Sequence, residues 1–219
     1  MRLLKAHTTK KVLLIGIGIL VVTLGLVLTY YLQHSDTNTA TIKKGPVVRY
    51  STDTPDETKP KPGYRWQGAP NEPKNITIPS AGIDNYIQNI GVDQRKELAV
   101  PNNIHVAGWF VDSVLPGEKG LSIIDGHLNG PNEDGVFINL EKVKMNDNIT
   151  IKFGDDSIKI FEVTKVEIVS LDEAATALYS QDPKASSQLN LITCGGMYDS
   201  TSRLYDKRVI ISSVLKKHL

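Results

Sequence analysis

The chain has 219 residues, and its 25 Lys and Arg against 24 Asp and Glu give a formal net charge of +1. The charge is nearly balanced and the aromatic residues, 6% of the chain, are scattered singly, which argues against a nucleic-acid-binding protein with a dense basic patch. One cysteine excludes an intramolecular disulfide framework and any paired-cysteine metal or redox motif.

An apolar segment near the amino terminus predicts a membrane anchor. Residues 12–32 contain no charged residue and follow a short basic tail, residues 1–11. A helix needs about 20 apolar residues to span a bilayer. The apolar core of a signal peptide is only about 7 to 15 residues long, so an uncleaved anchor is favoured over a signal peptide. The positive-inside rule then makes the protein a single-pass protein of the cell membrane, with a cytoplasmic tail and an extracellular domain.

The next segment has a different composition. Residues 33–75 are rich in Ser, Thr, Asp, Lys and Pro and contain few aliphatic side chains. Such a segment cannot bury enough apolar surface to offset the entropy lost on ordering. We therefore predict a flexible extracellular linker, in which only Tyr64 and Trp66 are candidates for docking on the domain or on the membrane interface.

Short strand-like runs separated by turn residues recur from Ile76 to the end of the chain. The expected strands cover residues 76–79, 86–91, 106–110, 121–126, 149–153, 157–169, 188–194 and 208–215. Helical patterns are confined to residues 171–179 and 136–140. In residues 157–169, apolar side chains occupy both parities, as in a sheet that closes on itself. Residues 76–219 are therefore predicted to form a mostly antiparallel, eight-stranded β-barrel with one or two short helices.

The single cysteine stands at the end of a predicted strand. A lone cysteine is usually a small buried hydrophobe. Cys194, however, ends the run of residues 188–194, where a side chain can face solvent or a ligand. We expect Gly195 and Gly196 to turn the backbone sharply and bring N–H groups near the sulfur, as an oxyanion site requires.

A cysteine nucleophile needs an acid–base partner, and five histidines are available. Three of them lie in the tail, in the linker and beside the chain end: His7, His34 and His218. His105 stands in a loop-like stretch, whereas His127 ends a predicted strand directly after Gly126. Because a glycine permits close approach of the backbone, we expect His127 to be the partner of the cysteine.

These motifs resemble those of sortases, the cysteine transpeptidases that attach proteins to Gram-positive-type cell walls. LITC at residues 191–194 is similar to the family's TLxTC signature, and PGEKGLSIIDGH at residues 116–127 is similar to PGxxGxxxxxGH. Arg208, directly before an apolar run, matches the arginine that opens the family's final strand. The resemblance covers about residues 76–215, is closest to class F with class A next, and implies the sortase β-barrel.

The resemblance also implies a mechanism. Cys194 would attack the Thr–Gly bond of an LPxTG-like sorting signal on a surface protein and form a thioacyl intermediate. His127 would donate and accept protons, and Arg208 would bind the substrate backbone and the oxyanion. The implied acceptor is an amine of a lipid-linked cell-wall precursor, and no cofactor or metal is implied.

Some residue assignments have alternatives. Arg203 is the alternative to Arg208, since both lie near the start of the last strand. Thr193 is expected to shape the pocket on resemblance, although a β-branched strand residue is the simpler interpretation. Glu133 and Asp134 supply too few oxygen ligands for a calcium site, so we expect both to be solvated.

Two other classes of function remain open from the sequence. The first is a hydrolytic cysteine peptidase on the same scaffold, which would cleave the peptide without joining it to an amine. The second is a catalytically silent, membrane-tethered binding domain.

Overall fold

The computed structural model describes residues 44–60 and 64–216, together with Gly25 and Thr29. The chain divides into two compact units, Met1–Ile42 and Lys43–Leu219. Among the described residues, no helix is long and apolar enough to cross a membrane. Apart from Gly25 and Thr29, the predicted anchor at residues 12–32 lies outside the described part of the chain, as does the predicted tail.

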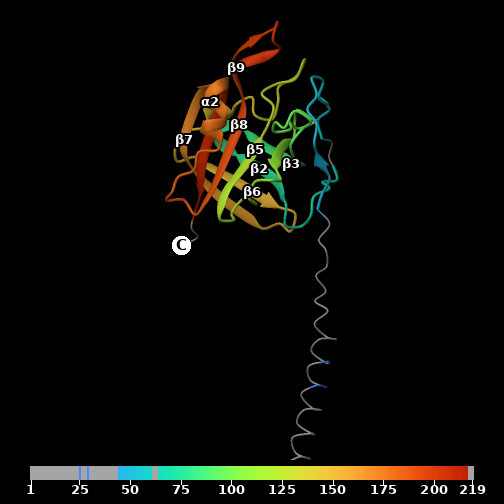
Figure 1. Cartoon of the computed structure of the whole chain (residues 1–219), viewed down its shortest axis with the longest axis vertical. Helices are drawn as coiled ribbons and strands as arrows, with labels where there is room; N and C mark the ends of the chain where they lie inside the picture. Colours follow the sequence, from blue (N-terminus) through green and yellow to red (C-terminus); the bar gives the residue numbers. More distant parts are fainter. Residues whose placement is uncertain (1–24, 26–28, 30–43, 61–63, 217–219) are drawn as a thin grey trace, which may run out of the picture. The chain divides into compact units, whose positions relative to one another are not determined.

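The second unit is built on eight strands that close into a β-barrel, as predicted (Figure 1). These strands are β2 (Pro73–Ile78), β3 (Ile83–Ile90), β4 (Ala107–Phe110), β5 (Gly120–Asp125), β6 (Asn148–Phe153), β7 (Ile158–Ser170), β8 (Ser187–Asp199) and β9 (Leu204–Leu215). Around the barrel the order is β3-β2-β6-β7-β9-β8-β5-β4, and β4 pairs with β3 to close the sheet. Neighbouring strands are antiparallel except β3–β4 and β5–β8, which are parallel.

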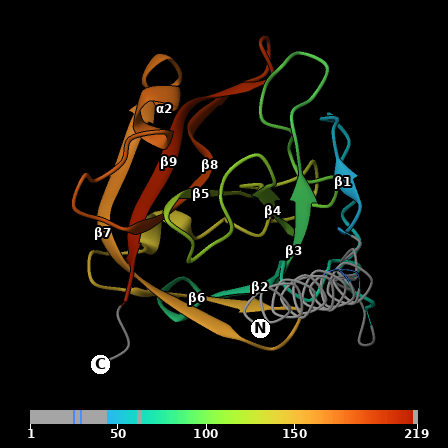
Figure 2. The same ribbon diagram turned by 60° about the horizontal axis from the view of Figure 1, so that its bottom comes forward.

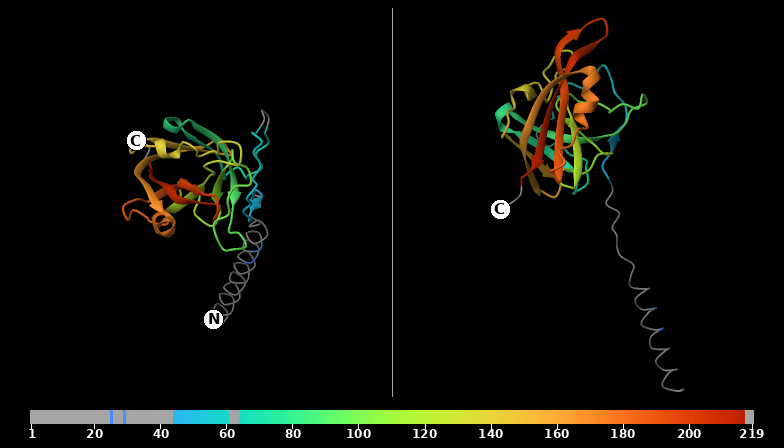
Figure 3. Two further views of the ribbon diagram at one scale, coloured as in Figure 1. Left: turned by 90° about the horizontal axis from the view of Figure 1, so that it is seen from above. Right: turned by 60° about the vertical axis from the view of Figure 1, so that its left-hand side comes forward.

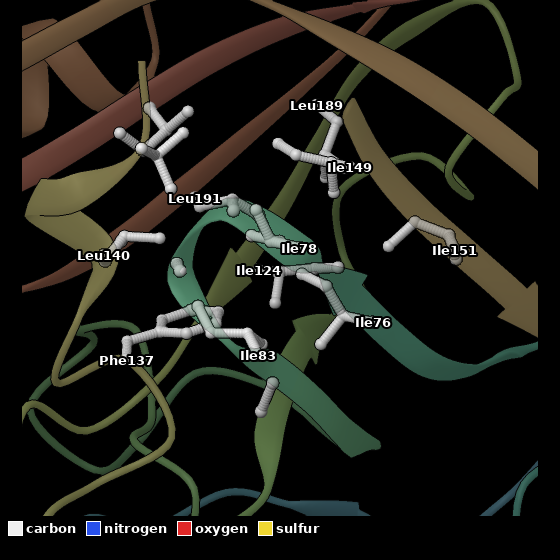
Figure 4. Close-up of a cluster of buried hydrophobic side chains, with 14 of the residues drawn as sticks. Ile76, Ile78, Ile83, Ile124, Phe137, Leu140, Ile149, Ile151, Leu189 and Leu191 are labelled. Carbon is white, nitrogen blue, oxygen red and sulfur yellow. The ribbon is translucent and has the colours of Figure 1, made fainter. Parts of the chain in front are cut away.

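Branched aliphatic side chains fill the barrel (Figure 4). On β6, the alternating residues Ile149 and Ile151 are fully buried, and Ile151 is directly paired with Ile76 of β2. Such alternation follows from the period of two in a strand, which sends every second side chain to the same face. Burying one such side chain contributes about 1.5–3 kcal/mol, so this interior is the main support of the fold.

The helix expected at residues 171–179 is present. Helix α2 (Leu171–Leu178) connects β7 to β8 and lies on the outside of the barrel (Figure 2). Its first turn is closed by Glu173, whose carboxylate accepts hydrogen bonds from the backbone N–H and the hydroxyl of Ser170. Leu178 packs against Ile192 of β8 and Ile210 of β9, so α2 covers the outer face of these strands.

The prediction of a helix at residues 136–140 is wrong. Residues 136–139 form turns, and only a short 3-10 turn, η2 (Leu140–Lys142), follows. The backbone N–H groups of Val136 and Phe137 donate to the carbonyls of Ile104 and His127, which are distant in the sequence. A second 3-10 turn, η1 (Pro79–Ala81), connects β2 to β3.

Strands β8 and β9 are longer than expected, and together they rise beyond the barrel as a hairpin (Figure 3). The prediction of a sharp turn directly after Cys194 is wrong, because Gly195 continues the strand and pairs with Lys207. The ladder is irregular only between Gly195 and Tyr198, where Gly196 adopts a φ of 77°. Glycine residues therefore form a bulge here rather than ending the strand.

The described part of the predicted linker contacts the barrel, whereas the sequence predicts a flexible segment. A short strand, β1 (Val47–Val48), pairs in parallel with the end of β3. The indole N–H of Trp66 donates to the Ile87 carbonyl over 2.8 Å. The buried carboxylate of Glu72 accepts hydrogen bonds from the N–H groups of Gly45 and Ala69. Residues 44–60, which we call the strap, are thus held by a few specific polar contacts that composition does not reveal.

Candidate active site

Cys194 of β8 and Arg208 of β9 are directly paired in the antiparallel ladder. Directly opposed residues project from the same face, with Cβ atoms about 5 Å apart. This is the outer face of the barrel. The paired residues Ile192 and Ile210 lie on the same face, two positions away along each strand, and they pack against α2. Both Cys194 and Arg208 are partly buried, so the thiol and the guanidinium meet in a site that remains open to solvent.

The Arg208 side chain is held in place by its own strand. Its Nη1 donates to the carbonyl oxygens of Tyr205, over 3.1 Å, and Lys207, over 2.8 Å. A guanidinium has five N–H donors, so two such bonds leave donors for a ligand. Arg208 can therefore stabilise negative charge that develops on a substrate bound at Cys194.

Asp125 lies in the site beside Cys194 and was left out by the sequence analysis. It ends β5 and is paired with Ile192, which lies two residues before Cys194, so the carboxyl group shares the face of the thiol. Burial raises the pKa of Asp125 to about 7, opposed by the hydrogen bond from the Gly126 N–H and by the Arg208 guanidinium. The sequence carried a signal, since Asp125 stands two residues before His127, but its orientation depended on β5 being regular to its end.

The thiol of Cys194 is harder to ionise than an ordinary cysteine. Burial raises its pKa most, the Asp125 carboxylate raises it further, and the Arg208 guanidinium lowers it in part. The neutral thiol therefore predominates at pH 7. A reaction that needs the thiolate must draw on a minor population or lower this pKa when substrate binds.

His127 lies two residues beyond the end of β5, the strand that runs parallel to β8. Its Nε2 is 2.6 Å from the Pro101 carbonyl oxygen. Because a carbonyl can only accept, the ring carries a proton on Nε2. Burial lowers the pKa of His127, so the neutral ring predominates at pH 7. Among the described residues, no hydrogen bond joins this ring to Cys194.

Two contacts fix the backbone around His127. The Thr193 hydroxyl donates to the Gly126 carbonyl over 2.7 Å, which links the residues that directly precede Cys194 and His127. The Phe137 N–H donates to the His127 carbonyl over 2.9 Å. A side chain at position 126 would bring a Cβ within 2.5 Å of the Phe137 ring, so the close approach expected at Gly126 is present.

The alternative candidates do not lie beside Cys194, although Arg203 lines a cavity together with His127. His105 is only 7% exposed, and its Nε2 lies 2.9 Å from the Glu57 carbonyl of the strap. Arg203 occupies the turn between β8 and β9, where it is exposed and lies 3.8 Å from Asp53. The structure therefore brings Arg208, and not Arg203, beside Cys194.

The described residues contain no group of three or more His, Cys, Asp or Glu side chains that could hold a metal ion. Glu133 forms an ion pair with Lys59 of the strap at 3.2 Å. Asp134 forms an isolated backbone bridge with Asn129.

A cavity of about 590 Å³ opens beside His127. Its walls come from strap residues 52–55, from the loop after His127 and from the β8–β9 hairpin, which contributes Tyr198 and Tyr205. The Tyr205 hydroxyl donates to the Asn129 side chain over 2.9 Å, and this bond joins the hairpin to the loop. The cavity has room for a second reactant on the His127 side of the site.

A thiol paired with a guanidinium, beside a strand end that bears an imidazole, is the arrangement of a cysteine enzyme for acyl transfer. A family model described as the sortase domain matches residues 76–216. The chain therefore belongs to the sortase family, whose members are generally cysteine transpeptidases.

Solved structures agree with this family. Sortase A from Corynebacterium diphtheriae, a lid mutant, is 26% identical with a TM-score of 0.52, covering 67% of this chain and 71% of that chain. Sortase C1 from Streptococcus agalactiae is 18% identical with a TM-score of 0.51, covering 68% of this chain and 69% of that chain. At 18% identity, the similarity to the second structure shows a shared fold only. No curated protein matches this sequence.

Proposed function

We propose that the protein is a membrane-anchored transpeptidase that cleaves an LPxTG-like sorting signal between Thr and Gly and joins the Thr carbonyl to an amine. The observation that carries the proposal is the direct pairing of Cys194 and Arg208 on the outer face of a sortase barrel. This pairing sets a nucleophile beside a fixed positive charge, as attack on a peptide carbonyl requires.

The first half-reaction forms the acyl enzyme. The Cys194 thiolate attacks the Thr carbonyl carbon, and the negative charge that develops on the carbonyl oxygen is stabilised by Arg208. The C–N bond to Gly then breaks, and His127 in its protonated form supplies the proton that the leaving amine takes. The products are a Cys194 thioester and a peptide that begins with Gly.

The second half-reaction regenerates the thiol. An amine of a lipid-linked cell-wall precursor attacks the thioester carbonyl, and His127 accepts the proton that this amine loses. The C–S bond breaks, and the new amide leaves with the surface protein. The cavity lined by His127, about 590 Å³ in volume, supports this step because it offers room for an amine beside the imidazole.

A transpeptidation assay tests the proposal against both alternatives. The full-length chain is incubated with a fluorescent LPxTG-like peptide and triglycine, and the products are separated by mass. We expect a ligated peptide as the main product. Cleavage without ligation would instead indicate a hydrolytic peptidase, and an unchanged peptide would favour a silent binding domain.

The membrane location needs its own test. The apolar run of residues 12–32 after a basic tail supports an anchor that leaves the barrel outside the cell. A protease added to intact cells should then degrade the barrel domain. If that domain stayed intact until the cells were lysed, the proposed topology would be wrong.

A further inference from the structure

A second cavity, of about 320 Å³, lies between the strap and strand β3. Its walls come from four strap residues, from the segment that follows the strap, from β3 and from one loop residue: Pro46, Val47, Val48, Tyr50, Tyr64, Trp66, Gln67, Gly68, Ile87, Gln88, Asn89 and Asn102. It shares no lining residue with the cavity beside His127. A volume of about 300 Å³ is at the small end of the range for ligand pockets, so the cavity suits a compact ligand.

Three aromatic side chains wall this cavity: Tyr50, Tyr64 and Trp66. The Trp66 ring is fixed by its hydrogen bond to the Ile87 carbonyl. Tyr50 and Tyr64 are 49% and 39% exposed, so their rings are accessible to a ligand. Rigid aromatic rings offer flat apolar surface to a ligand at a low cost in conformational entropy.

Two carboxamide groups in the same wall lack partners. Asn89 is only 4% exposed, and its Nδ2 has no hydrogen-bond partner among the described residues. The Nε2 of Gln88 is also buried and unpartnered within the described part of the chain. Successive strand residues project to opposite faces, so only one of these two amides can face the cavity. More than nine in ten buried polar groups are hydrogen-bonded, so one unpaired amide donor in the wall indicates a ligand that supplies an acceptor oxygen.

The cavity also selects by charge. Among the described residues, no Asp, Glu, Lys, Arg or His lines it, so these residues offer no counter-charge to a phosphate, a carboxylate or an amine. The ligand must therefore be neutral, present an apolar face to the aromatic rings and carry a carbonyl or hydroxyl oxygen for the amide donor. Sugars with acetamido groups combine these properties.

The geometry points to this cavity as a binding site for a neutral, N-acetylated glycan. A proline-rich peptide also combines an apolar surface with free carbonyls, but it binds as an extended helix of about 3.1 Å per residue and needs an elongated groove. The volume of about 320 Å³ has room for one or two sugar rings rather than for an extended peptide. A glycan bound in this cavity would contact both the strap and the barrel. Cys194 would take no part in its binding.

Calorimetric titration of the full-length chain with the trimer of N-acetylglucosamine tests the proposal. We expect saturable binding that is about tenfold weaker in Tyr50→Ala, since this change removes one stacking ring. Tyr179→Ala is the matched control, because Tyr179 is 51% exposed but lies at the end of α2. That variant should bind like the unchanged protein. Cellotriose, which lacks acetamido groups, should bind more weakly than the trimer.

Asn89→Ala provides a second variant that removes the unpartnered donor, and its folding is checked by circular dichroism. Cys194→Ala should bind the trimer normally, so the glycan site can be judged even if the proposed reaction is wrong. Absence of saturable binding, equal binding by Tyr50→Ala and the unchanged chain, or binding of a proline-rich peptide in place of the trimer would each overturn the proposal.

Discussion

The Thr193 hydroxyl donates a hydrogen bond over 2.7 Å to the carbonyl oxygen of Gly126. Each residue directly precedes a member of the proposed catalytic pair, so this bond couples the strand that carries Cys194 to the strand end that carries His127. Thr193 is buried. From the sequence alone, it could either shape the pocket or serve only as a β-branched strand residue.

Thr193→Val should therefore impair both stability and activity. The substitution keeps the shape of the side chain but leaves the Gly126 carbonyl without its buried donor, at a cost of about 1–3 kcal/mol in the free energy of unfolding. Urea denaturation measures this cost, and the peptide assay measures the fall in kcat. Thr164→Val is the control, because Thr164 bonds the Ser212 carbonyl on an exposed part of β7. Equal activity in both variants would contradict the coupling role.

The two histidines that the structure describes, His105 and His127, make a matched pair for testing the acid–base role. His127→Gln should lower kcat by about 10²–10⁴, the usual contribution of a general acid–base group. His105→Gln should retain most of the activity, because a glutamine can still donate to the Glu57 carbonyl. If His105→Gln were the inactive variant and His127→Gln the active one, the assignment of the imidazole would be wrong.

The roles of the two arginines near the β8–β9 turn, Arg203 and Arg208, can be distinguished by the same kind of substitution. Arg208→Gln should lower kcat by about 10²–10³, as expected when a donor to a developing oxyanion is lost. Arg203→Gln removes an exposed side chain at the hairpin turn and should change kcat little. Steady-state kinetics with the peptide substrate check both values, and the opposite order of effects would point to Arg203.

Because Cys194 is the only cysteine, its alkylation rate by iodoacetamide reports its ionisation directly. The unchanged protein should react with an apparent pKa above that of an ordinary thiol, since burial and Asp125 raise the pKa of Cys194. Asp125→Asn removes a carboxylate that disfavours the thiolate, so the profile should move to lower pH. Arg208→Gln removes a cation that favours the thiolate, so the profile should move to higher pH. Identical profiles in all three proteins would show that these charges do not act on the sulfur.

Apolar alternation predicted most of the barrel correctly. The run at residues 149–153 lies within β6, and the run at residues 121–126 forms β5 with both ends shifted by one residue toward the amino terminus. The parallel pairing of β5 with β8 has no local signal, because it joins segments about 65 residues apart through tertiary packing alone. The strap was predicted as part of a flexible linker because the contacts of Trp66 and Glu72 are sparse and do not change the local composition.

The candidate site was predictable to the extent that its residues terminate or pair strands. Cys194 and Arg208 were singled out by motif, and the register of β8 and β9 sets them opposite each other. Two features were missed. Gly195 and Gly196 suggested a turn, yet the pairing with β9 carries the strand onward. Asp125 could not be oriented before the length of β5 was known.

Intact-mass spectrometry of the full-length chain, mixed with an LPxTG-like peptide and quenched early without added amine, tests the central claim most directly. The account predicts a mass increase equal to the peptide segment that ends at Thr, located on Cys194 and absent from Cys194→Ala. Addition of triglycine should release this segment as a ligated peptide. The same adduct on Cys194→Ala, or peptide cleavage by that variant at the normal rate, would contradict the account.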